Sequence, residues 1–162
     1  MKILITYDSF FGNTQKIAKA IKDGFGSSHS IIFENVSNIK NEQLTVVDLL
    51  IVGSPTRGFR PSPNTSSFLK KITIKGLVNT KVAAFDTRLH LDSIKKSALK
   101  FIVDTGGYAA KPIAKQLIRK GGELIVPPEG FFVTGEEGPL KEDEIERAKN
   151  WAVFIEKNLK PE

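Results

Sequence analysis

Residues 7–14 bring a tyrosine, an acid, two aliphatic hydroxyls, a glycine and an asparagine into one short stretch. An apolar run at residues 3–5 precedes it and a helical apolar pattern follows, so we expect a strand that turns into a helix. The first amide N–H groups of a helix have no partner inside the helix and carry the positive end of its dipole, so such a turn attracts a phosphate. Ser9, Asn13 and Thr14 are also ordinary helix caps, and the residues alone leave both interpretations open.

The same stretch resembles the phosphate loop of the flavodoxin family, which usually reads Ser/Thr-x-Thr-Gly-x-Thr and holds the phosphate of FMN. Tyr7, Ser9 and the run Gly12-Asn13-Thr14 carry the resemblance. The chain departs from the family at Phe11, where a hydroxyl side chain is usual, and Phe10 is apolar as well. The resemblance implies a phosphate site made of the side chains of Ser9, Asn13 and Thr14 and the backbone N–H groups of Phe10, Phe11 and Gly12.

A second stretch rich in glycine and hydroxyl residues, residues 53–58, follows the apolar run at residues 46–52. It reads Gly-Ser-Pro-Thr-Arg-Gly and resembles the second flavin-contacting loop of the same family, while its Pro-Thr-Arg portion also resembles flavodoxin-like quinone reductases. A tight surface turn is the plain alternative, since Pro55 and Gly58 suit one. The resemblance implies that this loop lines one side of the flavin ring through Ser54, Pro55, Thr56, Arg57, Gly58 and Phe59.

A third loop, Asp86-Thr87-Arg88, follows the apolar run at residues 82–85. By the resemblance, Asp86, Thr87 and Arg88 line the pyrimidine end of the flavin. The family commonly sandwiches the ring between aromatic side chains from the second and third loops. This chain has Phe59 in the second loop, but no aromatic directly after Asp86, and Tyr108 serves only if the chain folds back.

Strand and helix patterns alternate along the 162 residues, which suits a single α/β domain spanning residues 1–162. We expect a flavodoxin-like three-layer sandwich, with a five-stranded parallel sheet in the order 2-1-3-4-5 and helices on both faces. In that order, ligands bind beyond the carboxyl ends of strands one and three, where the two glycine-rich loops lie. The expected strands cover about residues 2–7, 30–34, 46–52, 82–85 and 124–126, with residues 131–133 at an edge.

The expected helices follow from apolar spacing and from capping residues. They cover about residues 13–22, a segment after Ser62-Pro63, residues 93–101 and residues 108–120, with a short helical turn within residues 38–44. The last helix is expected to start near Lys141 and to place Ile145, Ala148, Ala152, Ile155 and Leu159 on one stripe. Trp151 flanks that stripe and is expected to be a packing residue.

Composition excludes several classes of site. The chain has no cysteine and two histidines, so disulfides and thiolate metal sites are excluded, and a histidine-rich metal site is not expected. The net charge of +6 is spread along the sequence, which predicts a solvated basic surface rather than a nucleic-acid site. The apolar run at the start is too short for a signal peptide and no run could span a membrane, so we expect a cytoplasmic protein.

The leading hypothesis from the sequence is an FMN-binding electron carrier that acts with a redox partner protein. Two alternatives remain open, namely an FMN-dependent reductase that passes hydride from a nicotinamide to a quinone, and a flavodoxin-fold interaction module that has lost FMN. A response-regulator receiver domain is not expected, because Ser54 and Pro127 stand where it needs an acid and a lysine. Arg57, Arg60 and Arg88 lie in the flavin-side loops, which predicts a less negative second reduction potential than in acidic flavodoxins and a partner with an acidic docking face.

Overall fold

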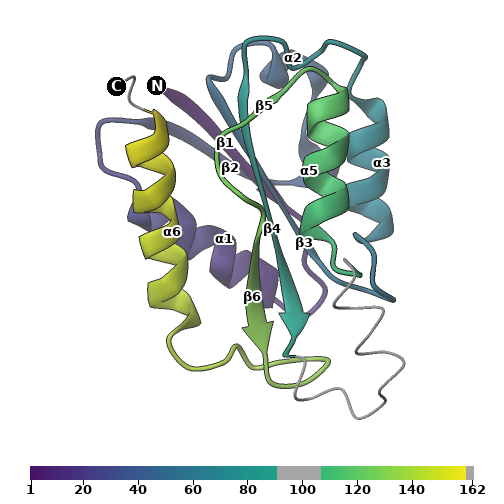
Figure 1. The fold of residues 1–162 in the computed structure, drawn as a ribbon, viewed down its shortest axis with the longest axis vertical. Helices are drawn as coiled ribbons and strands as arrows, with labels where there is room; N and C mark the ends of the chain where they lie inside the picture. The colour runs from purple at the N-terminus through teal and green to yellow at the C-terminus, as the bar shows by residue number, and fades with distance from the viewer. Residues whose placement is uncertain (91–106, 160–162) are drawn as a thin grey trace.

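A parallel sheet runs through the middle of the molecule (Figure 1), in a computed structural model that describes residues 1–90 and 107–159. The strands lie in the order β2-β1-β3-β4-β5, and β6 also pairs with β4. They are β1 (Lys2–Tyr7), β2 (Ser30–Asn35), β3 (Leu49–Pro55), β4 (Lys81–Leu89), β5 (Glu123–Leu124) and β6 (Glu129–Val133). This order confirms the predicted flavodoxin-like topology, with β2 at an edge of the sheet.

The fifth strand position is filled by two short pieces rather than by one strand. The sequence predicted a strand at residues 124–126, whereas β5 ends at Leu124 and pairs with the start of β4. The longer β6 pairs with the far half of β4. Pro127 and Pro128 lie between the two pieces, and proline has no N–H group to donate to a strand ladder.

Helices cover both faces of the sheet and complete three layers (Figure 1). The helices are α1 (Asn13–Gly24), α2 (Asn41–Leu44), α3 (Pro63–Lys71), α5 (Ala110–Arg119) and α6 (Glu144–Leu159), with a 3-10 turn η1 (Val36–Asn38). Ile3 and Ile5 of β1 pack in the core under α1 and α6, while Leu4 packs in the core under α3 and α5. The central strands are therefore buried on both faces, as their continuous apolar runs predicted.

The last helix differs from its prediction at its first turn. It begins at Glu144 rather than near Lys141, and Ile145, which was placed on the apolar stripe, is 40% exposed. Glu144 takes the buried position, because its carboxylate accepts a hydrogen bond from the Phe132 amide at 2.7 Å and from Arg147. Trp151 is a packing residue as predicted, with its ring edge-on to two buried phenylalanine rings of the core.

The other helix predictions are confirmed where the structure describes the chain. Ser62 caps α3 by accepting a hydrogen bond from the Thr65 amide, and Pro63 opens the helix. The helix predicted at residues 93–101 lies outside the described residues. None of the described helices is long and apolar enough to cross a membrane.

Candidate functional site

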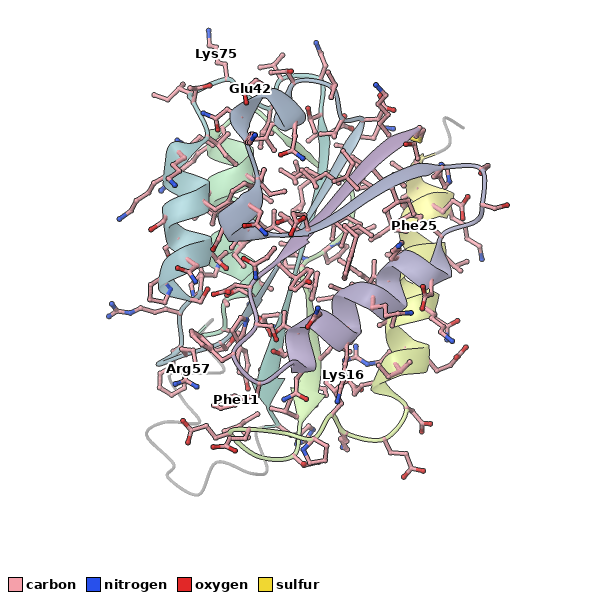
Figure 2. The ribbon with its side chains drawn as sticks, turned by 180° about the vertical axis from the view of Figure 1, so that it is seen from behind. Phe11, Lys16, Phe25, Glu42, Arg57 and Lys75 are labelled. Atoms are coloured by element: carbon pink, nitrogen blue, oxygen red, sulfur yellow. The ribbon has the colours of Figure 1, made fainter. Side chains whose placement is uncertain are left out.

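The carboxyl ends of β1, β3 and β4 surround an open hollow of about 240 Å³. The three predicted loops meet there, and Figure 2 shows Phe11 of the first loop beside Arg57 of the second. The residues that line the hollow are Ser9, Phe10, Phe11, Asn13, Thr14, Pro55, Thr56, Arg57, Gly58, Thr87, Arg88, Leu89, Val133 and Glu136. Four residues that the sequence placed in the site lie outside this lining, namely Gly12, Ser54, Phe59 and Asp86.

The loop between β1 and α1, which borders the hollow, contains backbone amides without an acceptor in the described part of the chain. Gly12 has a left-handed backbone with φ of 86°, and its amide donates to Ser9 Oγ at 3.0 Å. No side chain caps α1 at this residue. Unlike the amide of Gly12, the amides of four neighbouring residues have no acceptor within the described part of the chain. These residues are Phe10, Phe11, Asn13 and Thr14. Amides gathered at a left-handed residue before a helix form a concave anion site.

Two polar side chains of this loop bond to neighbouring loops. The hydroxyl of Thr14 lies 2.8 Å from the hydroxyl of Thr87, and both residues are buried. Asn13 Nδ2 donates to the carbonyl of Glu137 at 3.0 Å. Gly138 makes room for this amide, since a Cβ there would lie 2.6 Å from Asn13 Nδ2. The first loop is therefore fastened to β4 and to the connection between β6 and α6.

The loop after β3 ends in a tight hairpin turn. Arg57 and Arg60 exchange backbone hydrogen bonds of 2.9 and 3.0 Å, and the two residues between them, Gly58 and Phe59, have φ of 53° and 64°. Positive φ at both central residues defines a type I′ turn. A left-handed phenylalanine costs about 1–2 kcal/mol, which the closed hairpin must offset.

Ser54 supports the site from behind rather than lining it. Its side chain is fully buried, and its hydroxyl accepts a hydrogen bond from the Ser62 amide at 2.9 Å and donates to the Pro55 carbonyl. Ser62 in turn caps α3. The resemblance implied a contact with the flavin for Ser54, and the structure gives it the task of joining the second loop to the start of α3.

Arg57 covers the aromatic pair of the first loop. Its guanidinium carbon lies 4.8 Å from the ring centre of Phe10 and 5.8 Å from that of Phe11. Its Nη1 lies 3.7 Å from a carboxylate oxygen of Glu136. Phe10 and Phe11 remain 48% and 46% exposed, so these rings form a rim and not a core. An exposed cation–π contact contributes about 0.5–1 kcal/mol.

The third loop carries a buried ion pair. Arg88 Nε and Nη2 donate to the two oxygens of Asp86 at 2.6 and 2.7 Å, and Asp86 is fully buried. The Ala110 amide also donates to Asp86 at 2.8 Å, and the Ala109 amide donates to Thr56 Oγ1 at 3.1 Å. Burial raises the pKa of Asp86, while Arg88 acts in the opposite direction. Asp86 therefore lies behind the hollow, where it holds Arg88 and the start of α5.

Arg88 is fixed on both faces of its guanidinium group. The Cζ atom of Arg88 lies 3.8 Å from the centre of the Tyr108 ring. On β6, a Cβ added at Gly130 would lie 2.1 Å from the same Cζ atom of Arg88. The chain does fold back at Tyr108, but Arg88 stacks on its ring. The sequence allowed Tyr108 as a flavin stacker only if the chain folded back, and in this structure the ring packs against Arg88.

Three lining residues escaped the sequence analysis, namely Leu89, Val133 and Glu136. Leu89 ends β4 and Val133 ends β6, and the two pair across the sheet. The apolar run at residues 131–133 was a signal for this wall, but the sequence indicated an edge strand without indicating which loop it would face.

Comparison with known proteins decides the family. A model of the flavodoxin domain matches residues 4–132. The chain belongs to the flavodoxin family. Curated protein sequences gave no significant match.

Solved structures of flavodoxins, and part of one larger oxidoreductase chain, resemble this fold. A flavodoxin from the domain Archaea is 19% identical with a TM-score of 0.76, over 99% of this chain and 100% of that one. Flavodoxin 2 from Bacillus cereus is 23% identical with a TM-score of 0.75, over 97% and 99%. The rubredoxin:oxygen oxidoreductase of Desulfovibrio gigas is 21% identical with a TM-score of 0.70, over 99% of this chain and 37% of that one. At these identities the likeness supports the fold alone.

Members of the flavodoxin family bind FMN, and the residues of this hollow fit that group. The open amides around Gly12 supply the donors that a phosphate requires. Pro55, Gly58, Leu89 and Val133 supply uncharged walls for a planar ring. The exposed side chains of Phe10 and Phe11 do not remove any of these hydrogen-bond donors, because the donors are backbone amides.

Proposed function

We propose that this flavodoxin-family protein binds FMN in the hollow and carries electrons to and from a redox partner. The meeting of the open amides before α1 with the loops after β3 and β4, at the switch point of the sheet, carries the proposal. FMN, when bound, supplies the one- and two-electron chemistry, and the protein binds and tunes it. No side chain of the chain has to act as a covalent catalyst.

Each loop has a separate task in this proposal. The amides of Phe10, Phe11, Asn13 and Thr14, together with the Thr14 hydroxyl, bind the phosphate. Backbone donors thus take the place of the hydroxyl side chains that the family usually has at residues 10 and 11. The hairpin around Gly58 borders one side of the ring. Arg88, fixed by Asp86, places a positive charge beside the hollow. The basic rim at Arg57 and Arg60 suits a partner with an acidic docking face.

The phosphate site is tested by comparing FMN with riboflavin, which lacks the phosphate. We expect Thr14→Ala to weaken FMN binding by about tenfold to a hundredfold, since a hydrogen bond to a charged group contributes roughly 1.5–3 kcal/mol. Riboflavin binding should change much less. Quenching of flavin fluorescence during titration gives both dissociation constants.

Two control variants separate the phosphate contact from other effects. Thr87→Val breaks the hydroxyl contact between Thr14 and Thr87 but leaves the Thr14 hydroxyl, so it should affect FMN and riboflavin alike. Thr45→Ala removes an exposed hydroxyl bonded to the Glu42 carbonyl far from the hollow, and should change neither affinity. Equal losses of both flavins in Thr14→Ala would show that this loop does not hold the phosphate.

A further inference from the structure

The fold gathers the positive charge of the chain on one half of the molecule. Residues 49–90 and 107–122, which build β3, α3, β4 and α5, contain eleven lysines and arginines and one acid, the buried Asp86. The remaining described residues contain nine basic and fourteen acidic side chains. Six of the basic side chains are exposed on the α3–α5 face, namely Lys70, Lys71, Lys75, Lys111, Lys115 and Arg119. Because the basic residues are spread along the sequence, the sequence alone did not indicate that the fold separates basic from acidic side chains.

An apolar tip adjoins this face at the end of α3. Ile74 is 80% exposed and Val78 is 52% exposed in the turns that connect α3 to β4. Ile118, at the neighbouring end of α5, is 49% exposed. None of these three side chains belongs to the hydrophobic core formed by the described residues.

The tip, residues 73–79, is rigidly attached to the fold. Ile72 and Leu77 are buried beside it. The Leu77 amide donates to the Lys120 carbonyl at 3.0 Å, and Lys120 Nζ donates to the Ile72 carbonyl at 2.5 Å. Lys75 has φ of 63°, a left-handed conformation that costs a lysine energy. The backbone of the tip is therefore anchored to the core and to the end of α5.

The tip and the hollow lie at opposite ends of the molecule. Figure 2 shows Lys75 projecting outward at one end, while Phe11 and Arg57 lie at the other. A surface that covered the tip would leave the hollow open to a partner. Glu42 on α2 lies at the same end of the molecule as Lys75 in this view, so that end is not uniformly basic.

We propose that the α3–α5 face binds anionic lipid surfaces, with Ile74 and Val78 entering the headgroup layer. Lysine-rich surfaces bind anionic lipids electrostatically, and aliphatic side chains add the energy of burial. Protein interfaces are depleted in lysine and enriched in aromatic side chains, and no aromatic side chain of α3 or α5 is exposed. The same lack of aromatic side chains argues against single-stranded nucleic acid, which stacks its bases on them.

Sedimentation with vesicles tests this inference on the full chain, whether or not FMN is bound. We expect binding to vesicles of phosphatidylcholine mixed with phosphatidylserine, little binding to pure phosphatidylcholine, and release at high salt. Lys71→Gln and Lys115→Gln should each weaken the partition about fivefold. Ile74→Ser should weaken it about tenfold at constant net charge.

Matched controls come from the opposite side of the molecule. Lys149→Gln and Val153→Ser change a lysine whose side chain is 43% exposed and a 40% exposed valine on α6, and should leave the partition unchanged. Equal losses in Lys149→Gln and Lys71→Gln would reduce the effect to net charge and overturn the assignment to this face. An unchanged partition in Ile74→Ser would overturn insertion of the tip. Absence of vesicle binding, with or without binding to an oligonucleotide, would overturn the proposal as a whole.

Discussion

Arg57 and Arg88 both bring positive charge to the hollow, but their surroundings differ. The Arg57 side chain is 43% exposed, and its nearest acid, Glu136, is 78% exposed. The Arg88 side chain is 17% exposed and bonded to both oxygens of the fully buried Asp86. Arg57 therefore acts as a single solvated charge, whereas Arg88 acts together with a carboxyl group that can take up a proton.

The two arginines should differ in their effect on the second one-electron potential of bound FMN. At an effective dielectric of about 20, a charge roughly 6 Å away contributes on the order of 2–3 kcal/mol, and water reduces this at an exposed site. Arg57→Gln should therefore lower the potential. Arg88→Gln should lower it less, because removing Arg88 removes the influence that lowers the pKa of Asp86 and shifts that buried carboxyl toward its neutral form.

Reductive titration of the two variants, with Lys149→Gln as a distant control, measures this difference. Arg88→Gln should also lower the free energy of unfolding, since it removes one partner of a buried ion pair. If Arg57→Gln leaves the second potential where it was, Arg57 does not tune the flavin.

At the scale of elements, most strands and helices were predicted from apolar periodicity and caps, and the strand order was predicted from the resemblance to the flavodoxin family. What the sequence did not indicate are contacts between distant segments. Asp86 and Thr56 hold the amides at the start of α5 from 24 and 53 residues away, and no local pattern marks such a cap. The three loops of the site were found because each has its own local motif. Leu89 and Val133 have no motif, and only the pairing of β4 with β6 brings them to the hollow.

The hairpin at Gly58 gives a prediction at this scale. We expect Gly58→Val to abolish FMN binding while the far-ultraviolet circular dichroism stays unchanged. A Cβ at Gly58 meets nothing within 4 Å, so the reason is not a clash but φ of 53°, which a β-branched residue resists. The turn would rearrange and displace Arg57 and Phe59.

Gly58→Asn is the matched control, because asparagine tolerates the left-handed region and is common in type I′ turns. It should keep most of the affinity for FMN. Full affinity in a folded Gly58→Val variant would make this loop an ordinary surface turn.

At the scale of the whole molecule, charge is separated between two faces, and the carboxyl of Asp86 lies fully buried beside Arg88 and the start of α5. Folding shifts the pKa values of Asp86 and Glu34 in opposite directions. Burial raises the pKa of Asp86 from 3.8, whereas hydrogen bonds from Asn38 and the Asn35 amide lower the pKa of Glu34 from 4.5. Asp86 thus binds its proton more tightly in the folded state than in the unfolded state, and Glu34 binds its proton less tightly.

The free energy of unfolding should show both signs. The contribution of Asp86 to the free energy of unfolding is fully present below pH 3.8 and is lost as the pH rises through its folded pKa. Asp86→Asn should therefore remove a decline of stability that begins above pH 3.8. The contribution of Glu34 is present above pH 4.5 and is lost as the pH falls, so Glu34→Gln should remove a decline on the acid side. Urea unfolding at a series of pH values, with each variant subtracted from the parent protein, gives two difference curves. Their slopes should be opposite, and parallel slopes would mean that the buried pair holds Asp86 ionised more strongly than burial opposes it.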